Sequence, residues 1–293
     1  MTFLAPPELD LDDPRLIATL DDVPLWSAPF GLALLATVRL RPKLSVLEVG
    51  CGTGFPLVEL AQRLGPTCHL VGLDPWRAAL DRAAQKIEQV GLGNVELVCG
   101  SAEQMPFPDQ SFGLVVSNNG LSNVADLDQA LAECARVCTP GAQLVTTHNL
   151  PETMAEVYQP YAAILRSMGR QAEVERLGAH IHDKRKTVAE MTGALVRHGF
   201  ERVVVTEDVF HMRFIDGSTM LQHFLIRLGF LEPWKAILEP ADVDEVLARL
   251  TEHLDEQARQ DGELRLTVPF ACIDAVARPE GANRSSSGIW HGG

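Results

Sequence analysis

The chain has 293 residues, of which 46% are hydrophobic, and it carries a formal net charge of −14. This length and apolar content are sufficient for one sizeable core. The acidic balance argues against nucleic acid and anionic membrane surfaces as partners, because both are bound by basic faces. No apolar run is long enough to span a bilayer, and the acidic N-terminus does not resemble a signal or transit peptide. We therefore expect a cytoplasmic protein with no membrane span and no nucleic-acid partner.

The six cysteines are expected to be reduced, because no secretion signal precedes them and none forms a C-x-x-C pair. They are Cys51, Cys68, Cys99, Cys134, Cys138 and Cys272. Cys134 and Cys138 are spaced to share one face of a helix, where we interpret them as small core residues rather than metal ligands.

The first 40 residues precede the first expected strand. Residues 24–31 form an apolar, aromatic run with turn residues, and a helix is predicted over residues 32–40. This N-terminal helical cap either covers an edge of the sheet or closes over a ligand, and in the second case Trp26 would contact the substrate.

From residue 43 onward, short apolar runs alternate with helical patterns. Strands are predicted over residues 44–49, 69–73, 95–99, 112–117 and 143–147, the last after a turn at Pro140-Gly141. Helices are predicted over residues 57–64, 76–90 and from 127 to Cys138, with Asp126 as the N-cap of the third. This rhythm indicates parallel βαβ units in an α/β, Rossmann-like, doubly wound sheet, with the ligand at the carboxyl ends of the strands.

After residue 150 the alternation stops. Helices are expected over residues 151–169, near residues 221–228 and over 242–260, and the first of them is kinked or split at Pro160. A further helix is expected to begin at the capping box Thr187–Glu190 and to end near Gly199. Strands are expected over residues 202–214 and 263–277. We therefore predict a seven-stranded, mostly parallel sheet with helical lid insertions in a single domain over residues 1–278. Its parts are the cap (1–40), the ligand-binding core (41–150), the lid helices with the sixth strand (151–262) and the last strand (263–278), followed by a disordered tail over 279–293.

A glycine-rich turn, Glu48-Val49-Gly50-Cys51-Gly52-Thr53-Gly54, follows the first strand and leads into a helix. Such a turn lets a ligand approach the backbone, and the helix N-terminus offers free N–H groups. Phe55 stands where the dinucleotide fingerprint G-x-G-x-x-G requires its third glycine. Asp74 ends the second strand, 20 residues after Gly54, and is interpreted as a ribose-binding carboxylate rather than a plain turn residue before Pro75.

Two further segments follow strands: Gly100-Ser101-Ala102-Glu103-Gln104-Met105-Pro106-Phe107 comes after the third strand, and Asn118-Asn119 comes after the fourth. Together with the glycine-rich turn and Asp74, they make the chain resemble the class I S-adenosylmethionine-dependent methyltransferases. The resemblance covers residues 44–148 and points to the methyltransferase type 11 subgroup, which contains the ubiquinone and menaquinone methyltransferases. It implies S-adenosylmethionine as the cofactor and S-adenosylhomocysteine as its product.

The resemblance also implies roles for individual residues. Glu48, Gly50, Cys51, Gly52, Gly54 and Asn118 would hold the methionine end, Asp74 the ribose hydroxyls, and Pro75, Trp76, Ser101, Ala102 and Glu103 would surround the adenine. The family usually has an acid at the position of Ser101, so the contact to the adenine amino group is in doubt.

Methyl transfer from a sulfonium is an in-line displacement that depends on proximity and on the exclusion of water, so a base is needed only if the acceptor must lose a proton. His148 and Asn119 are the catalytic candidates; the candidate substrate contacts are Trp26, Asn119, Ser122, Asn123, His148 and Tyr158. His180, His182 and Asp183 have no further ligand at a supporting spacing, so no metal site is expected.

The sequence favours transfer of a methyl group to a small-molecule acceptor by a monomer or homodimer. A non-catalytic regulatory protein that binds S-adenosylmethionine stays open as an alternative. A nicotinamide oxidoreductase is disfavoured by Phe55 and Glu48.

Overall fold

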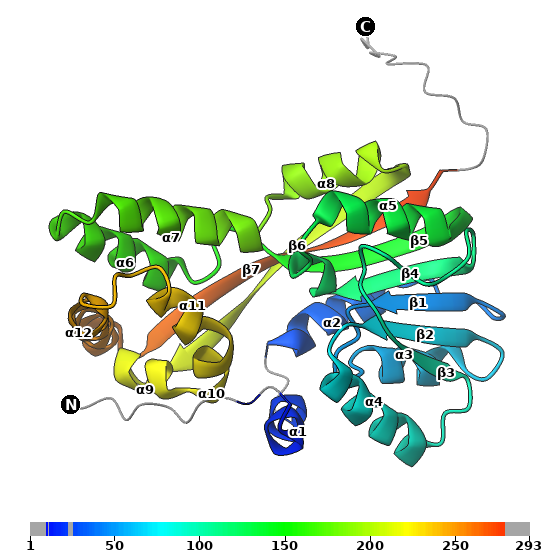
Figure 1. Ribbon diagram of the computed structural model, residues 1–293, viewed down its shortest axis with the longest axis horizontal. Helices are drawn as coiled ribbons and strands as arrows, with labels where there is room; N and C mark the ends of the chain where they lie inside the picture. Colours follow the sequence, from blue (N-terminus) through cyan, green and yellow to red (C-terminus); the bar gives the residue numbers. More distant parts are fainter. Residues whose placement is uncertain (1–9, 11, 23–25, 279–293) are drawn as a thin grey trace, which may run out of the picture.

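The computed structural model describes residues 10, 12–22 and 26–278. In this part of the chain seven strands form one sheet in the order β3-β2-β1-β4-β5-β7-β6, with helices on both faces (Figure 1). The strands β1 to β5 run parallel, whereas β7 pairs antiparallel with both β5 and β6. The predicted α/β, Rossmann-like, mostly parallel seven-stranded sheet is confirmed.

The first half of the sheet follows the sequence pattern closely. Its strands are β1 (Ser45–Val49), β2 (His69–Asp74), β3 (Val95–Cys99), β4 (Phe112–Asn118) and β5 (Cys138–Asn149), and its helices are α3 (Leu57–Leu64), α4 (Arg77–Val90) and α5 (Leu127–Val137). Local signals set the helix ends: Gly65 and Gly91 follow α3 and α4 with φ of 73° and 74°. The side chain of Asp126 accepts the N–H of Gln129 at 2.9 Å, as an N-cap does.

Two expectations around α5 were wrong. Cys138 has an extended backbone (φ −70°, ψ 134°) and begins β5, so it does not share a helix face with Cys134. The Pro140-Gly141 turn lies inside β5 rather than before it. The pairing of β4 with β5 shifts register between Phe112 and Leu114, so this turn is absorbed as an irregularity in the strand.

The N-terminal part also differs from its prediction. Helix α2 runs from Ser27 to Thr37 rather than over residues 32–40, with Pro29 in its first turn, where the missing N–H of proline is tolerated. A preceding helix, α1 (Pro14–Asp22), was not predicted. A short 3₁₀ turn, η1 (Gly120–Ser122), follows β4.

The helices after β5 form a separate layer, except α8, which packs against the sheet beside α5. They are α6 (Ala155–Ser167), α7 (Gln171–Lys184), α8 (Val188–Arg197), α9 (Gly217–Gln222), α10 (Phe224–Ile226), the π-helical turn η2 (Arg227–Leu231), α11 (Glu232–Lys235) and α12 (Val243–Asp261). Pro160 lies inside α6 without splitting it, and the Thr187–Glu190 capping box is present. The single helix expected near residues 221–228 is wrong, because His223 has an extended backbone (φ −62°, ψ 136°) and separates α9 from α10. Helix α7 was not predicted.

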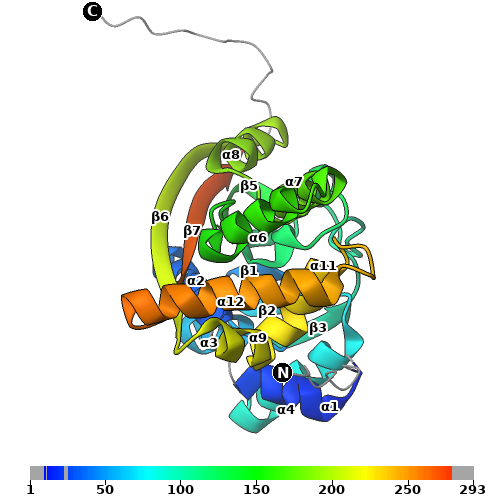
Figure 2. The same cartoon turned by 90° about the vertical axis from the view of Figure 1, so that its left-hand side faces the viewer.

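Strands β6 (Phe200–Phe214) and β7 (Leu264–Ala277) form a long ribbon. They pair from Phe200↔Ala277 to Phe214↔Leu264, whereas β5 pairs only with residues 270–276 of β7. The free part of the ribbon extends away from the sheet and carries the helices α6, α9 and α12 at its far end (Figures 1 and 2). We call these helices, with α7, α10 and α11, the helical unit.

The hydrophobic side chains form a core on each side of the sheet and another in the helical unit. Alternation along β5 separates the first two: Leu144 packs with α5 and α8, and Val145 packs with α2 and α3. The third core contains Leu264 and Leu266 of β7. The ribbon therefore joins the helical unit to the sheet through shared apolar packing.

Two features are absent from the described residues. No helix there has the length and apolar character needed to cross a bilayer. No group of three potential metal ligands occurs there either, and His180, His182 and Asp183 belong to no such group. The tail over 279–293, expected to be disordered, lies outside the described residues.

Candidate functional site

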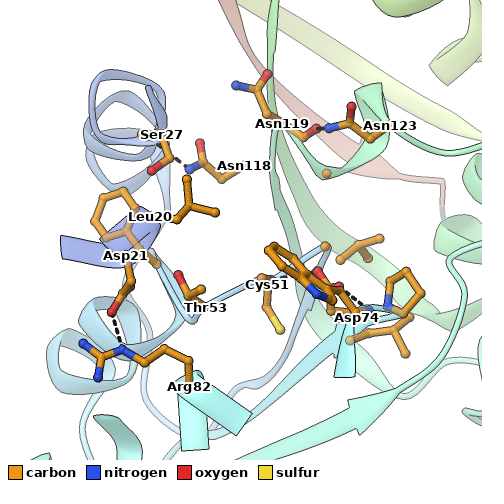
Figure 3. Close-up of a pocket in the computed structure, with 18 of the residues that line it drawn as sticks. Leu20, Asp21, Ser27, Cys51, Thr53, Asp74, Arg82, Asn118, Asn119 and Asn123 are labelled. Atoms are coloured by element: carbon orange, nitrogen blue, oxygen red, sulfur yellow. Dashed lines mark hydrogen bonds and ion pairs between the residues drawn. The ribbon is translucent and has the colours of Figure 1, made fainter. Parts of the chain in front are cut away.

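A cavity of about 840 Å³ lies at the carboxyl ends of β1, β2 and β4, where the strand order reverses (Figure 3). Its walls come from α1, the start of α2, the turn after β1, the end of β2, the loops after β3 and β4, one side of α4 and Leu225 of α10. Sites for small molecules have volumes of this order and favour this position in open α/β sheets. We call it the first cavity.

The glycine turn forms the floor of the first cavity. The N–H groups of Gly50 and Cys51 both donate to the carbonyl of Leu73, at 2.8 and 3.2 Å, which draws the turn against the end of β2. A Cβ on Gly52 would meet nothing within 4 Å, so the backbone there faces open space. Gly54 instead packs against Ala83 of α4 and does not line the cavity.

Asp74 ties the end of β2 to this turn. Its Oδ2 accepts the N–H of Gly52 at 2.8 Å, and its Oδ1 accepts the N–H of Trp76 at 2.8 Å. Each carboxylate oxygen has a second lone pair, and the residue lines the cavity. Asp74 is therefore both a structural link and an acceptor available to ligand hydroxyls.

Glu48 lies directly before the turn and is fully buried. Neither of its carboxylate oxygens has a hydrogen-bond partner among the described residues, and the side chain does not line the cavity. Burial, together with the nearby charge of Asp74, holds the pKa of Glu48 well above its usual range. A buried polar group without a partner is uncommon, and such groups concentrate at functional sites.

Helix α1 closes one side of the cavity through Asp21, a contact that the sequence did not reveal. Asp21 forms an ion pair with Arg82 of α4 at 2.9 Å (Figure 3) and another with Lys86 of the same helix at 2.6 Å. Burial raises the pKa of Asp21, but hydrogen bonds from Lys86, Thr53 and Arg82 outweigh it and lower the pKa overall. Thr53 belongs to the glycine turn, so α1, α4 and the turn meet at this carboxylate.

The side of the cavity nearest β3 holds the residues expected around an adenine. Pro75, Trp76, Ala102 and Glu103 line it, whereas Ser101 does not. The hydroxyl of Ser101 donates to a carboxylate oxygen of Glu103. The other oxygen of Glu103 accepts the N–H of Ala125 at 2.8 Å, which anchors the loop after β4.

The opposite end of the cavity is formed by the end of β4 and the start of α2. Asn118 is held by Ser27, whose carbonyl accepts from its amide at 3.2 Å, and by the hydroxyl of Thr147, which donates to it at 2.9 Å. Asn119 has a left-handed backbone (φ 61°), and both polar atoms of its side chain lack a partner among the described residues. Trp26 and Asn123 also line this end.

Trp26 joins this end of the cavity to an aromatic cluster. Its ring centre lies 5.6 Å from that of Phe30, 6.1 Å from Phe210 and 5.3 Å from Phe230. The first cavity is therefore polar along the turn and β2, and aromatic and apolar where it meets the helical unit.

Three of the residues expected to bind substrate lie elsewhere. His148 and Ser122 line a second cavity, of about 670 Å³, on the face of the sheet covered by α5 and α8. Tyr158 lines neither cavity: its hydroxyl accepts from Arg185 and from the indole N–H of Trp234, both at 2.9 Å, within the helical unit. The structure thus gathers most of the cofactor residues and separates the substrate candidates.

Known proteins resemble the central part of the chain. Residues 47–146 match the family model described as "Methyltransferase domain". A demethylmenaquinone methyltransferase from Listeria welshimeri is 41% identical over 107 residues, which are 36% of this chain and 45% of that protein. The chain therefore spans about half the length of the curated relatives that it matches.

Solved structures extend the likeness to most of the fold. The YcgJ protein from Bacillus subtilis has a TM-score of 0.55 at 18% identity, covering 86% of this chain and 99% of that one. The [4+2]-cyclase SpnF has a TM-score of 0.50 at 20% identity, covering 86% and 82%. At these identities the likeness concerns the fold, which accommodates more than one chemistry.

Proposed function

We propose that residues 47–146, which match the family model described as "Methyltransferase domain", form a class I methyltransferase domain of the menaquinone and ubiquinone type, and that the whole chain transfers a methyl group from S-adenosylmethionine to a small-molecule acceptor. The observation that carries the proposal is the hydrogen bond between Gly52 and Asp74 at the floor of the first cavity. It places an open stretch of backbone beside a carboxylate with free lone pairs, which suits a ligand with both a charged end and a ribose.

The residues of the first cavity fit S-adenosylmethionine. The open backbone at Gly52 and the amide of Asn118 suit the methionine end, Asp74 suits the ribose hydroxyls, and Pro75, Trp76 and Ala102 offer surfaces for the adenine. The carboxyl group of Glu48 lies buried beneath the turn without a hydrogen-bond partner, and a cationic group of a ligand nearby would favour its ionised form. We assign no contact to Ser101, which lies outside the cavity wall.

When bound, S-adenosylmethionine supplies a methyl group that its positively charged sulfur activates for displacement. The protein must hold the acceptor in line with this group and exclude water. The unpartnered amide of Asn119 can donate to or accept from an acceptor and so orient it. Helix α1, held by Asp21, covers the cavity and limits the access of water.

The acceptor would lie at the aromatic end of the first cavity, beside Trp26 and Asn119. Aromatic walls with a few polar groups suit an apolar or aromatic small molecule with one polar substituent. We therefore propose an acceptor of this class, with a menaquinone-like ring as its first candidate. His148 faces the second cavity, so we do not assign it as the base.

Calorimetry with the full chain tests the cofactor. We expect S-adenosylmethionine to bind at micromolar concentration and NADH not to bind. Asp74→Ala removes acceptors for two hydroxyls and should weaken S-adenosylmethionine binding roughly ten- to hundredfold. Asp81→Ala is the matched control, because Asp81 is a more exposed carboxylate on α4 that pairs with Arg77.

The second stage tests transfer. The protein is incubated with S-adenosylmethionine labelled on its methyl group and with a panel of acceptors that includes demethylmenaquinone. Transfer of label to any small molecule supports catalysis. Binding without transfer to any of them would favour the non-catalytic alternative, and failure of S-adenosylmethionine to bind would end the proposal.

A further inference from the structure

The second cavity is separate from the first but shares a wall with it. It lies between the loop after β4, the start of α5, the end of α7 and α8, and Val124 and Ala125 line both cavities. Its volume of about 670 Å³ is in the range of small-molecule sites. Leu121, Leu127 and Met191 contribute apolar side chains to its lining.

His148 lies on the wall of this cavity formed by β5. It is 2% exposed, and neither ring nitrogen has a hydrogen-bond partner among the described residues. Burial lowers the pKa of His148 to about 4, so the ring is neutral at pH 7, with one nitrogen as donor and the other as acceptor. A hydroxyl group on a ligand would form a hydrogen bond with one of these ring nitrogens.

The end of α7 brings positive charge to the same cavity. Lys184 and Lys186 line it, and Arg185 between them is 3% exposed and contacts Tyr158. In the described part of the chain none of these three cations forms an ion pair with a carboxylate, although the charge of Lys186 helps to lower the pKa of Glu190. Arg185 itself does not line the cavity, so the cations that can face a ligand there are Lys184 and Lys186.

The carboxylates of the cavity are mostly engaged elsewhere. Asp126 caps α5, Asp128 pairs with Arg197 and His198, and Glu190 closes the capping box of α8. Asp183 is the exception, with no partner among the described residues. Lys184 and Lys186, which line the cavity without forming an ion pair among the described residues, are therefore available to an anionic group of a ligand.

We propose that the second cavity is a binding site for a small organic acid that carries an apolar body, a carboxylate facing Lys184 and Lys186, and a hydroxyl facing His148. This site is distinct from the first cavity and does not depend on the proposed methyl transfer. The carboxylate would pair with Lys184 and Lys186, which form no ion pair among the described residues, and the hydroxyl would form a hydrogen bond with the imidazole, which has none there.

Calorimetry of the full chain with three matched probes tests this. The probes are 3-(4-hydroxyphenyl)propionate, 3-phenylpropionate, which lacks the hydroxyl, and 3-(4-hydroxyphenyl)propanamide, which lacks the charge. We expect the hydroxy acid to bind, and each of the other two to bind roughly tenfold more weakly, because each loses one polar contact. Inorganic phosphate serves as a fourth probe, for charge without an apolar body.

Variants assign the contacts. His148→Leu should reduce the affinity of the hydroxy acid to that of 3-phenylpropionate and leave the latter unchanged. The double variant Lys184→Gln/Lys186→Gln should weaken both acids and spare the amide. Asn119→Ala, in the first cavity, is the control and should change none of the three affinities. Unchanged melting temperatures would show that each variant is folded.

The proposal is overturned if the hydroxy acid does not bind at millimolar concentration, or if it binds equally well to the His148 and lysine variants. Loss of binding in Asn119→Ala would place the probe in the first cavity and also overturn it. Phosphate that binds more tightly than the hydroxy acid would reject the requirement for an apolar body. None of these results bears on S-adenosylmethionine binding, which is measured separately.

Discussion

Gly50 and Gly120 meet backbone to backbone between the glycine turn and the loop after β4. A Cβ on Gly50 would lie 2.7 Å from Cα of Gly120, and a Cβ on Gly120 would lie 2.4 Å from the carbonyl oxygen of Val49. Gly50 also has a φ of 75°, which side chains rarely adopt. The turn is thus fixed to β4 by a contact that only two glycines allow.

This contact predicts different costs for alanine at two positions of the turn. Gly50→Ala adds a backbone clash to the left-handed strain, so we expect it to lower the free energy of unfolding by roughly 3–5 kcal/mol. Gly52→Ala carries the strain alone (φ 51°, open space) and should cost about 1–2 kcal/mol, while its methyl group intrudes on the cavity. Urea unfolding measures the free energy of unfolding of both variants. Equal losses would contradict the conclusion that the Gly50–Gly120 contact excludes a side chain.

The ion pairs of Asp21 predict how firmly α1 stays closed. The side chain of Asp21 is 9% exposed, and those of Arg82 and Lys86 are 27% and 24% exposed, so solvent screens these pairs only partly. Asp21→Asn should release α1 and speed both its hydrogen exchange and the dissociation of S-adenosylmethionine by roughly tenfold. Asp22→Asn is the comparison, because Asp22 also pairs with Arg82, at 3.3 Å, but through a side chain that is 69% exposed and therefore more strongly screened. Identical exchange in both variants would mean that α1 is held by other contacts.

Burial of His148 predicts a dependence of stability on pH. Because its pKa is lower in the folded chain (about 4) than the ordinary value of 6.5, the unfolded chain takes up a proton first as the pH falls. This contribution to stability is complete above about pH 6.5 and declines towards pH 4, by about 3 kcal/mol at most. His148→Leu should remove this pH-dependent contribution. The free energy of unfolding of the wild type, relative to that of the variant, should therefore decrease as the pH falls from about 6.5 to about 4. Parallel curves from chemical unfolding at several pH values would refute it.

The hydroxyl of Tyr158 predicts an unequal effect of two similar substitutions. Tyr158→Phe leaves two buried donors, on Arg185 and Trp234, without their acceptor, so we expect a loss of about 2–4 kcal/mol in the free energy of unfolding. Tyr161→Phe removes a single bond, in which the phenol donates to the carbonyl of Trp234 at 2.7 Å, and should cost about 1–2 kcal/mol. Thermal or urea unfolding compares the pair. A smaller loss for Tyr158→Phe would show that its two donors find other acceptors.

Features set by neighbouring residues were predictable from the sequence. The Asp126 cap, the Thr187–Glu190 box and the glycine ends of α3 and α4 each depend on a few adjacent residues, and all are present. The glycine turn and Asp74 also came from local pattern and spacing, and the structure brings them into contact.

Features set by contacts between residues distant in the chain could not be predicted from the sequence. Helix α1 is anchored by Asp21 to residues 61 and 65 positions away, and nothing near Asp21 indicates them. His148 was placed near the first cavity because it ends β5, but the alternation of β5 turns it to the opposite face, beside α8. Tyr158 belongs to the helical unit because Trp234 and Arg185 reach its hydroxyl from remote segments.

Strand β7 supplies side chains to all three main cores: Ile273 to one face of the sheet, Cys272 to the other, and Leu266 to the helical unit. It also comes after every other described element in chain order. Ribosomes deliver a chain from its N-terminus, at roughly 5–20 residues per second. The apolar faces of β5, β6 and α12 therefore stay exposed on the nascent chain until β7 leaves the ribosome and packs against them. During that time these faces are available for chaperones to bind.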